Sequence, residues 1–330
     1  MDCNKWLLFS CALTLCSGAW AVDSPAYGNL ATPDIDDIEY IDDEEPSERE
    51  VNLGKMLFFD NRLSKHQNQS CATCHNPELG FSDGLAKGIG SGGDILGRNA
   101  PHLYNLAWSS IFFWDGRAKS LEEQALGPIV SDVEMQMTPK EALQRLEKVA
   151  FYKKEFKEVY GALTFENIGR AIAAFEMTII SDDSAFDKYL AGQREAMSHS
   201  AIRGLKLFVG KARCVKCHDG ANFTDDSFHN IGIEDNDDGR FAVDPNSKLK
   251  GAFKTPGLRN IIMSAPYMHD GSLASLEEVV EHYDKGAVNV KNVSPLIVPL
   301  NLNPQEKADL IAFMAALTDP VVITRPQLPN

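Results

Sequence analysis

The feature that most constrains this 330-residue chain is a five-residue pattern, C-x-x-C-H, that occurs twice. This pattern is the attachment sequence of c-type haem. Its two thiols can meet the two vinyl groups of one porphyrin, and the histidine that follows then faces the iron. The sequence therefore predicts two covalent haems, one held by Cys71, Cys74 and His75 and the other by Cys214, Cys217 and His218.

The first 21 residues have the pattern of a cleavable export signal. Lys5 supplies a positive charge, WLLFSCALTLC is a short apolar run, and GAWA ends at Ala21 with the small residues of a cleavage site. The run is too short to span a membrane, and no other stretch is long enough. We therefore expect a periplasmic protein without a membrane span.

Zinc binding and disulfide formation are the alternative uses of the four cysteines that follow the signal. Two C-x-x-C pairs could build one four-cysteine zinc site, and exported proteins often form disulfides. Neither use explains the histidine after each pair, and the pairs begin 143 positions apart, at Cys71 and Cys214. The two identical units favour haem.

The chain is acidic, with a formal net charge of −15 and a run of acidic residues at 34–50. This charge argues against nucleic acid as a partner. We interpret residues 22–50 as a solvated, mobile acidic arm. The alternative is an acidic surface that steers a basic redox partner.

A weak internal repeat surrounds the two units. LGKMLFF (53–59) precedes the first unit, and GLKLFVG (204–210) precedes the second. Each unit is followed by an apolar pattern with helical spacing, at 167–180 and at 306–317. No sustained alternation indicates a sheet, so we expect two related, mostly helical modules.

We place the domain boundary between residues 190 and 191, which gives an N-terminal domain over 51–190 and a C-terminal domain over 191–330. Stretches rich in Gly, Asp, Asn and Pro at 85–101 and 232–248 predict long irregular loops. The second stretch contains EDNDDGR, which resembles a calcium-binding EF-hand loop but lacks the glutamate at its twelfth position. We interpret it as solvated.

The chain resembles the bacterial di-haem cytochrome c peroxidase family over nearly its whole mature length. The matching stretches, in the family's order, include LGKMLFFDNRLS, RNAPHLYN, FFWDGRA, LEEQALGPI, VEM, RAIAAFE and APYMHDGSLASLEEVVEHY. The resemblance implies two all-α, cytochrome c-like domains with one haem c each. It implies a peroxidatic haem in the N-terminal domain, an electron-transfer haem in the C-terminal domain, and one calcium ion between them.

The resemblance also implies catalytic roles for three residues. Glu134 matches a glutamate that takes a proton from hydrogen peroxide and returns it to the leaving oxygen. Gln124 matches a second polar residue beside the peroxide, and Trp114 matches a tryptophan that relays electrons between the haems. Without the resemblance, Glu134 and Gln124 would be interpreted as surface residues and Trp114 as core packing.

The resemblance implies a calcium site as well. The family holds the ion with one asparagine side chain and two backbone carbonyls, and the matching positions are Asn99, Ser264 and Pro266. Oxygen ligands of this kind suit a hard cation.

The first departure from the family's pattern lies near the N-terminal haem. In the loop GIGSG (88–92), Ser91 stands where conventional members have a histidine ligand. A serine hydroxyl is a poor ligand for haem iron, so we expect an iron that is open to peroxide. His102 is the alternative ligand.

The second departure lies on the predicted helix 272–286. Tyr283 stands where conventional members have a methionine ligand to the C-terminal haem, on an apolar face that also includes Val279. His282 lies on the polar face and should point away, and Met268 is the rival ligand. Tyrosine here, without the histidine in the first loop, is typical of the MauG-like subgroup, and a phenolate ligand favours ferric and higher oxidation states.

These features predict a MauG-like peroxidase. Hydrogen peroxide would react at the N-terminal haem of the diferric protein, and Trp114 would share the oxidising equivalents with the C-terminal haem. The electron donor would be a cytochrome c, a cupredoxin or a protein with oxidisable aromatic residues. MauG's own exit route, a surface tryptophan before the second unit, is missing, because Ala212 or its neighbours occupy that place.

Two alternatives stay open. A conventional cytochrome c peroxidase would have Met268 or another ligand on the C-terminal haem and would use reduced cytochrome c. A non-catalytic di-haem electron carrier would have two six-coordinate, low-spin irons.

Overall fold

The computed structural model describes residues 27–40, 44–233, 236–287 and 290–330. The predicted export signal, residues 1–21, lies outside these ranges. None of the helices in the described ranges is long and apolar enough to cross a membrane.

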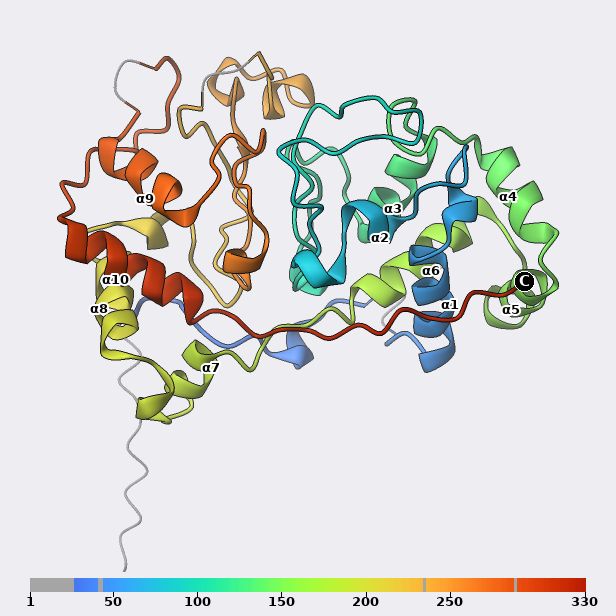
Figure 1. Ribbon diagram of the computed structural model, residues 1–330, viewed down its shortest axis with the longest axis horizontal. Coiled ribbons are helices and arrows are strands. Elements are labelled where there is room, and N and C mark those ends of the chain that lie inside the picture. Colours follow the sequence, from blue (N-terminus) through green and yellow to red (C-terminus); the bar gives the residue numbers. More distant parts are fainter. Residues whose placement is uncertain (1–26, 41–43, 234–235, 288–289) are drawn as a thin grey trace, which may run out of the picture.

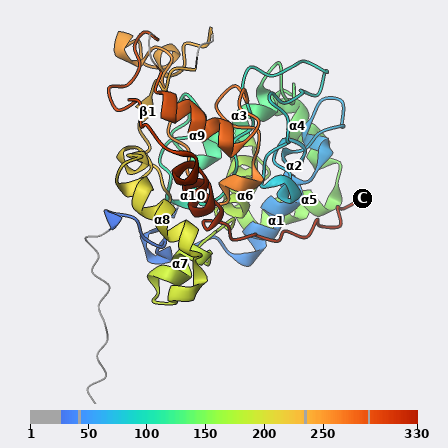
Figure 2. The same cartoon turned by 60° about the vertical axis from the view of Figure 1, so that its left-hand side comes forward.

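The described chain is mostly helical and forms two modules that lie side by side (Figures 1 and 2). Its only strands are β1 and β2, two residues each, which pair antiparallel in the second module. The expected all-α class is confirmed. The elements are α1 (Glu48–Phe58), α2 (Cys71–Cys74), α3 (Leu121–Val130), α4 (Pro139–Glu147), α5 (Ala150–Tyr160), α6 (Phe165–Glu176), α7 (Ala185–Leu190), α8 (His199–Val209), β1 (Phe228–His229), β2 (Phe253–Lys254), α9 (Leu276–Lys285) and α10 (Pro304–Ala315).

Residues 27–40 pack against the body of the protein instead of forming a free arm. Leu30 and Ile38 are buried, and the indole N–H of Trp108 donates to the carbonyl of Asp34 at 3.0 Å. The expectation of a solvated arm is therefore wrong for residues 27–40. Leu30 and Ile38 each join a hydrophobic cluster of the body, while Ile35 and the acidic side chains of this segment stay exposed.

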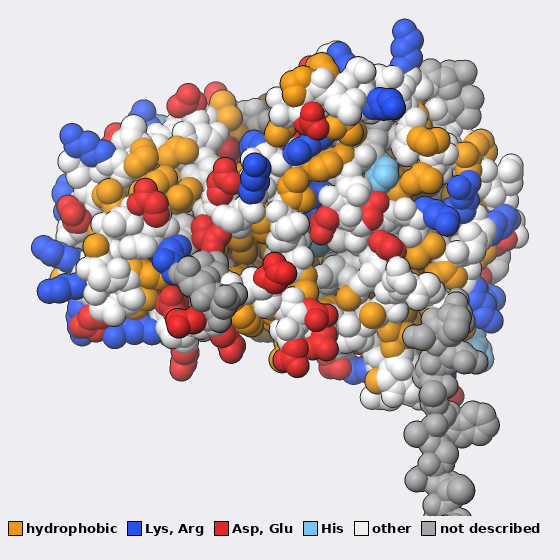
Figure 3. Space-filling model, turned by 180° about the vertical axis from the view of Figure 1, so that it is seen from behind, with side chains coloured by type: hydrophobic (Ala, Val, Ile, Leu, Met, Phe, Trp, Pro, Cys, Tyr) orange, Lys and Arg blue, Asp and Glu red, His pale blue; other side chains and the backbone are white. Residues whose placement is uncertain are grey.

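The face of the molecule in Figure 3 carries charges of both signs. Acidic side chains gather along its lower middle part, and Lys and Arg lie mostly along its outer margins. A basic partner would therefore meet a local acidic region on this face rather than a uniformly acidic surface.

Each module is built on one closely crossed helix pair, α1 with α6 in the first and α8 with α10 in the second. A glycine makes each crossing possible. A Cβ on Gly54 would lie 1.7 Å from the carbonyl oxygen of Ala171, and a Cβ on Gly204 would lie 1.9 Å from that of Asp309. The backbones are thus in contact at both crossings, which confirms the internal repeat in three dimensions.

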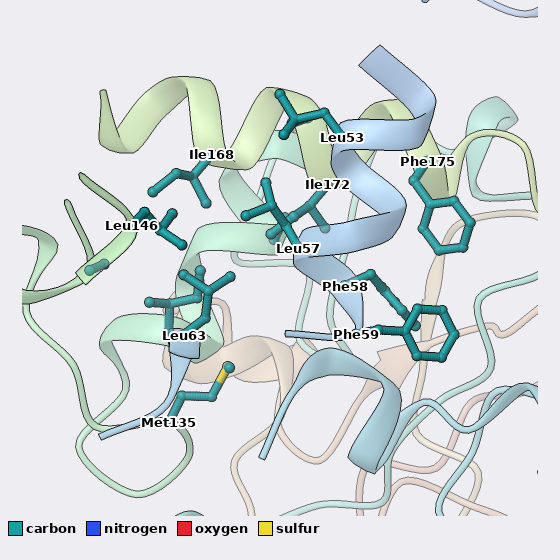
Figure 4. Packing of buried hydrophobic residues seen from close by; sticks show 14 of the residues in the cluster. Leu53, Leu57, Phe58, Phe59, Leu63, Met135, Leu146, Ile168, Ile172 and Phe175 are labelled. Atoms are coloured by element: carbon teal, nitrogen blue, oxygen red, sulfur yellow. The ribbon is translucent and has the colours of Figure 1, made fainter. Parts of the chain in front are cut away.

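The first module's core lies between α1, α6 and the helices around them (Figure 4). Leu53, Leu57 and Phe58 of α1 face Ile172 and Phe175 of α6. The capping box of Ser47 and Glu50 starts α1, so the helix begins at Glu48, before the LGKMLFF stretch.

The second module's core contains a group of aromatic rings in edge-to-face contact, Phe186, Phe208, Phe223 and Phe313. Phe186 lies on α7, so this helix packs with the second core although it precedes residue 191. The domain boundary stays a prediction, and this packing favours a position before α7.

Candidate active site

The four cysteines of the two C-x-x-C-H units are free thiols and form no disulfide. Burial raises the pKa of Cys74 to about 11 and that of Cys214 to about 12. Buried, protonated thiols are poor redox nucleophiles. The four do not converge on one metal site in the described residues, because the first pair lines one cavity and Cys217 lines another. This arrangement fits haem attachment and not a four-cysteine zinc site, although ligand atoms of Cys217, Asp225 and His229 lie within 4.8 Å of one another.

The histidine of each unit is held in the same way. His75 Nδ1 bonds the carbonyl of Phe81 at 3.1 Å, and His218 Nδ1 bonds the carbonyl of Phe223 at 2.9 Å. Burial lowers the pKa of both rings, and the carbonyl bonds oppose this shift only in part. A neutral ring that donates from Nδ1 presents Nε2 as the free ligand atom, as metal-bound histidines usually do.

Each unit opens onto its own cavity. The N-terminal cavity has a volume of about 550 Å³ and is lined by His75, Gln124 and Glu134, among others. The C-terminal cavity has a volume of about 140 Å³ and is lined by His218 and Tyr283, among others. The structure thus gathers the predicted catalytic residues around the first unit and the predicted tyrosine ligand around the second.

Trp114 lines both cavities. Its indole N–H donates to the carbonyl of Asn99 at 2.9 Å, and its own carbonyl accepts from the backbone N–H of Lys254 at 2.8 Å. Lys254 belongs to the second module, so hydrogen bonds from both modules hold this residue, the first to its indole and the second to its backbone, between the two cavities.

In the N-terminal cavity, the Oε1 atom of Gln124 is buried and has no hydrogen-bond partner. Glu134 lines the same cavity, and its backbone carbonyl accepts from the N–H of Ser91 at 2.7 Å. A buried, unpartnered amide oxygen calls for a bound group or water in the cavity. The cavity therefore fits a cofactor together with polar substrate atoms.

Ser91 and His102 do not present ligands to this cavity. The Ser91 hydroxyl donates to Asn68 Oδ1 at 2.7 Å. His102 Nε2 bonds the carbonyl of Gly257 at 2.9 Å, and its Nδ1 accepts from the backbone N–H of Tyr104 at 3.3 Å. Both imidazole nitrogens of His102 are thus occupied by backbone groups.

In the C-terminal cavity, Tyr283 points inward and its neighbour does not. His282 Nε2 bonds the carbonyl of Ile231 at 2.9 Å, as expected for the polar face of α9. Burial raises the pKa of Tyr283 well above its usual range, with the Cys217 and Cys214 thiols as smaller causes. Met268 lines the same cavity, so both candidate ligands reach it.

The internal repeat relates α3 to α9 and identifies the residue of α3 that is equivalent to Tyr283. The bridges Phe112–Ala118 and Tyr267–Leu273 precede these helices, and the two bridges are 155 positions apart, as are the helix starts. At this spacing Pro128 of α3 matches Tyr283 of α9. Pro128 lines the N-terminal cavity and offers no side-chain ligand.

The three predicted calcium positions lie together. Asn99, Ser264 and Pro266 all line the C-terminal cavity. The side-chain nitrogen of Asn99 donates to the carbonyl of Leu85 at 3.0 Å, so the amide oxygen is the atom left for a cation. This arrangement is compatible with an oxygen-rich site next to Trp114.

The described part of EDNDDGR, residues 236–240, forms a contact between the modules, and the interpretation of this segment as solvated is wrong for Asp237 and Arg240. Asp237 accepts from Arg98 at 2.7 Å, and Arg240 donates to the carbonyls of Asp115 and Gly116 at 3.0 and 2.7 Å. The loop is therefore hydrogen-bonded to the turn that follows Trp114. Its charged residues are conspicuous in the sequence, but only the fold brings their partners within reach.

Glu176 and His229 are ionisable residues at the cavities that the sequence did not identify as site residues. Glu176, the last residue of α6, lines the N-terminal cavity and is only 3% exposed. His229 lines the C-terminal cavity and bonds Asp225 at 2.8 Å, which raises the pKa of His229 to about 10. Helical spacing is a signal for the first, because Glu176 follows Ile172 by four residues on an apolar face.

Comparisons with known proteins agree with this geometry. Residues 48–195 match the family model described as di-haem cytochrome c peroxidase. The methylamine utilization protein MauG of Methylorubrum extorquens is 40% identical, and the match covers 98% of each chain. The cytochrome c551 peroxidase of Nitrosomonas europaea is 37% identical over 81% of this chain and 79% of the relative.

A solved structure is similar in fold as well. The crystal structure of a MauG-like protein associated with microbial copper homeostasis has a TM-score of 0.78 and 33% sequence identity. The match covers 91% of this chain and 96% of that one.

Proposed function

Since the chain belongs to the di-haem cytochrome c peroxidase family, as a MauG-like peroxidase, we propose that it reduces hydrogen peroxide at the N-terminal cavity without prior reduction. The single observation that supports this site is that none of the candidate positions for a second ligand, among the residues that the structure describes, offers a free side-chain donor to the N-terminal cavity. Ser91 donates its hydroxyl to Asn68, both nitrogens of His102 are bonded, and Pro128 stands where the repeat has Tyr283.

The family implies two haem c groups, and the residues present fit them. Cys71, Cys74 and His75 would hold one haem, and Cys214, Cys217, His218 and Tyr283 would hold the other. When bound, the haems supply the redox chemistry that converts peroxide to water. The Tyr283 phenolate, as a hard anionic ligand, favours the ferric state of the C-terminal site.

Glu134 and Gln124 act on the peroxide itself in this proposal. The Glu134 carboxylate takes a proton from one peroxide oxygen and returns it to the oxygen that leaves as water. Gln124 orients the peroxide by a hydrogen bond. Both side chains line one cavity, so both can reach the same ligand.

Trp114 relays oxidising equivalents between the two sites. It is the tryptophan that lines both cavities, and its hydrogen bonds to Asn99 and Lys254 restrict its motion. A calcium ion held by Asn99, Ser264 and Pro266 would stabilise the same region, because Asn99 also accepts from the indole.

The electron donor is proposed to be a cytochrome c, a cupredoxin or a protein with oxidisable aromatic residues. Members of this family are typically periplasmic, and the predicted signal at residues 1–21 would direct this chain there. Ala212 is buried, so an exit route through the surface at that position is not proposed.

The experiment adds hydrogen peroxide to the diferric holoprotein and follows near-infrared absorption in a stopped-flow instrument. We expect a rapid spectral change without any reductant. Glu134→Gln should slow it by a factor of about 10²–10⁴, the usual contribution of a general acid–base group. Glu166→Gln, an exposed acid on α6, is the matched control. A diferric wild-type protein that does not react would overturn the proposal.

Electron paramagnetic resonance of the resting protein separates the alternatives. An open N-terminal site predicts one high-spin and one low-spin ferric signal. Two low-spin signals would favour a di-haem electron carrier, and a requirement for reduced cytochrome c before any reaction would favour a conventional cytochrome c peroxidase.

A further inference from the structure

Glu176 is a buried acid that the proposed mechanism does not use. It ends α6, is 3% exposed and lines the N-terminal cavity. Its Oε2 atom has no hydrogen-bond partner, and no ion pair in the described residues involves it. A carboxyl group in this position must be neutral or must meet a donor inside the cavity, because burial of an unpaired charge is costly.

The internal repeat shows that packing does not require an acid here. Gly54 packs on Ala171 and Phe175, and Gly204 packs in the same way on residues 309 and 313. These pairs are 138 positions apart, so Glu176 of α6 matches Met314 of α10, which lines the C-terminal cavity. The second module has the thioether of Met314 at this position, whereas the first module has the carboxyl group of Glu176, which can hold a proton.

A second unpartnered oxygen faces the same cavity. Gln124 lies on α3, and α3 packs against α6. The contact includes Gly169 of α6, which lies against the Glu122 carbonyl and the Leu126 side chain of α3. Its Oε1 atom is buried without a partner, like Oε2 of Glu176. Two such oxygens in one cavity call for ordered water as donor and acceptor. Burial raises the pKa of Glu176 to about 8, so it holds a proton at neutral pH.

We propose that Glu176 and Gln124 bind ordered water in the N-terminal cavity and that Glu176 supplies a proton consumed in peroxide reduction. This inference rests on the proposed function. Reduction of hydrogen peroxide to two waters consumes two electrons, which the redox partner supplies, and two protons. Glu134 returns the proton it takes, so both protons must enter the cavity. When the redox partner supplies the electrons, the Glu176 O–H bond breaks and its proton passes through ordered water to the second peroxide oxygen, which needs two protons to leave as water. The carboxylate then regains a proton from solvent.

The test follows steady-state peroxide turnover by the holoprotein with a one-electron donor (ferrocyanide) and substitutions at position 176. Glu176→Gln keeps the shape and the hydrogen bonds but removes the acidic proton, and Glu176→Met copies the second module. We expect each to slow this turnover about tenfold, less than loss of a direct acid–base group costs, and to leave the initial reaction of the diferric protein with peroxide unchanged. Glu176→Asp should recover part of the rate, and Glu166→Gln should react as wild type does. Unchanged resting spectra would show that the cavity itself is intact.

Infrared spectroscopy of the resting protein provides a readout that does not depend on peroxide. We expect the C=O stretch of a protonated carboxylic acid, shifted in D2O, in wild type and not in Glu176→Gln. Absence of this band in wild type, or a wild-type rate in Glu176→Gln and Glu176→Met, would overturn the inference. If the band is present but the wild-type protein does not react with peroxide, the proposed function is refuted, whereas the protonated state of Glu176 is confirmed.

Discussion

Single residues distinguish two cavities that the repeat otherwise makes alike. Pro128 and Tyr283 occupy matching turns of α3 and α9, and Glu176 and Met314 occupy matching ends of α6 and α10. Each exchange replaces a group with one of different chemistry at an equivalent position of the repeat. At these positions the first module has a proline and an acid, while the second has a phenol and a thioether.

Tyr283→Phe tests the proposed ligand at this scale. Loss of the phenol oxygen should change the low-spin ferric signal in the resting electron paramagnetic resonance spectrum, because the ligand field of the C-terminal iron changes. His282→Gln is the control, since His282 bonds the Ile231 carbonyl outside the cavity. A low-spin signal that is the same in Tyr283→Phe and wild type would refute ligation by Tyr283.

The raised pKa of Glu176 also predicts how the effect of Glu176→Gln on stability depends on pH. Burial raises the pKa of Glu176 from 4.5 to about 8, so the folded state holds a proton that the unfolded state loses. Wild-type stability therefore falls as pH rises through this window. Compared with wild type at the same pH, Glu176→Gln should have a free energy of unfolding that is a few kcal/mol higher at about pH 8 and almost unchanged at about pH 4. Chemical denaturation at both pH values checks this; an equal gain at both would contradict it.

At the scale of elements, the helix pairs were predictable and the loops were not. Apolar spacing at 167–180 and 306–317 predicted α6 and α10, because a helix that buries one face repeats every 3.6 residues. The loop 232–248 has no such period. Its contacts depend on Arg98 and on the carbonyls after Trp114, which come from the other module.

Gly54→Ala tests the helix crossing. The new Cβ would overlap the Ala171 carbonyl, so α1 and α6 must separate, and we expect a loss of about 1–3 kcal/mol or more in stability. Asn52→Ala, an exposed change on the same helix, should be nearly neutral. Thermal unfolding of the holoprotein measures both. Equal melting temperatures for the two variants would show that the crossing tolerates a methyl group.

At the scale of the whole molecule, the two modules are joined by more than their linker. The C-terminal segment leaves α10 and crosses to the first module (Figure 1), where Val321, Ile323 and Leu328 pack on its core. Arg62 donates to the Pro329 carbonyl at 2.7 Å. The predicted C-terminal domain, 191–330, therefore ends on the surface of the other one.

Deletion of residues 321–330 tests this connection. Partial exposure of three apolar side chains should cost about 2 kcal/mol, since a fully buried side chain of this type contributes about 1.5–3 kcal/mol. We expect the melting temperature to fall and the inter-haem spectral change with peroxide to weaken. Val322→Ser, at an exposed position of the same segment, is the control. A deletion variant with wild-type melting and spectra would rule out a role in joining the modules.

The sequence by itself determined the parts of this protein that depend on local spacing. Two C-x-x-C-H units predict two haems because the thiols and the imidazole are neighbours along the chain, and apolar periodicity predicts the paired helices. The tertiary structure decided what depends on residues far apart in the chain. Residues 27–40 pack on the body of the protein, and Trp114 lies between the two cavities. The 232–248 loop contacts the turn that follows Trp114, and Glu176 lines the first cavity without a hydrogen-bond partner for its Oε2 atom. Burial and partnership are properties of the packed molecule, and they give Glu176 its proton.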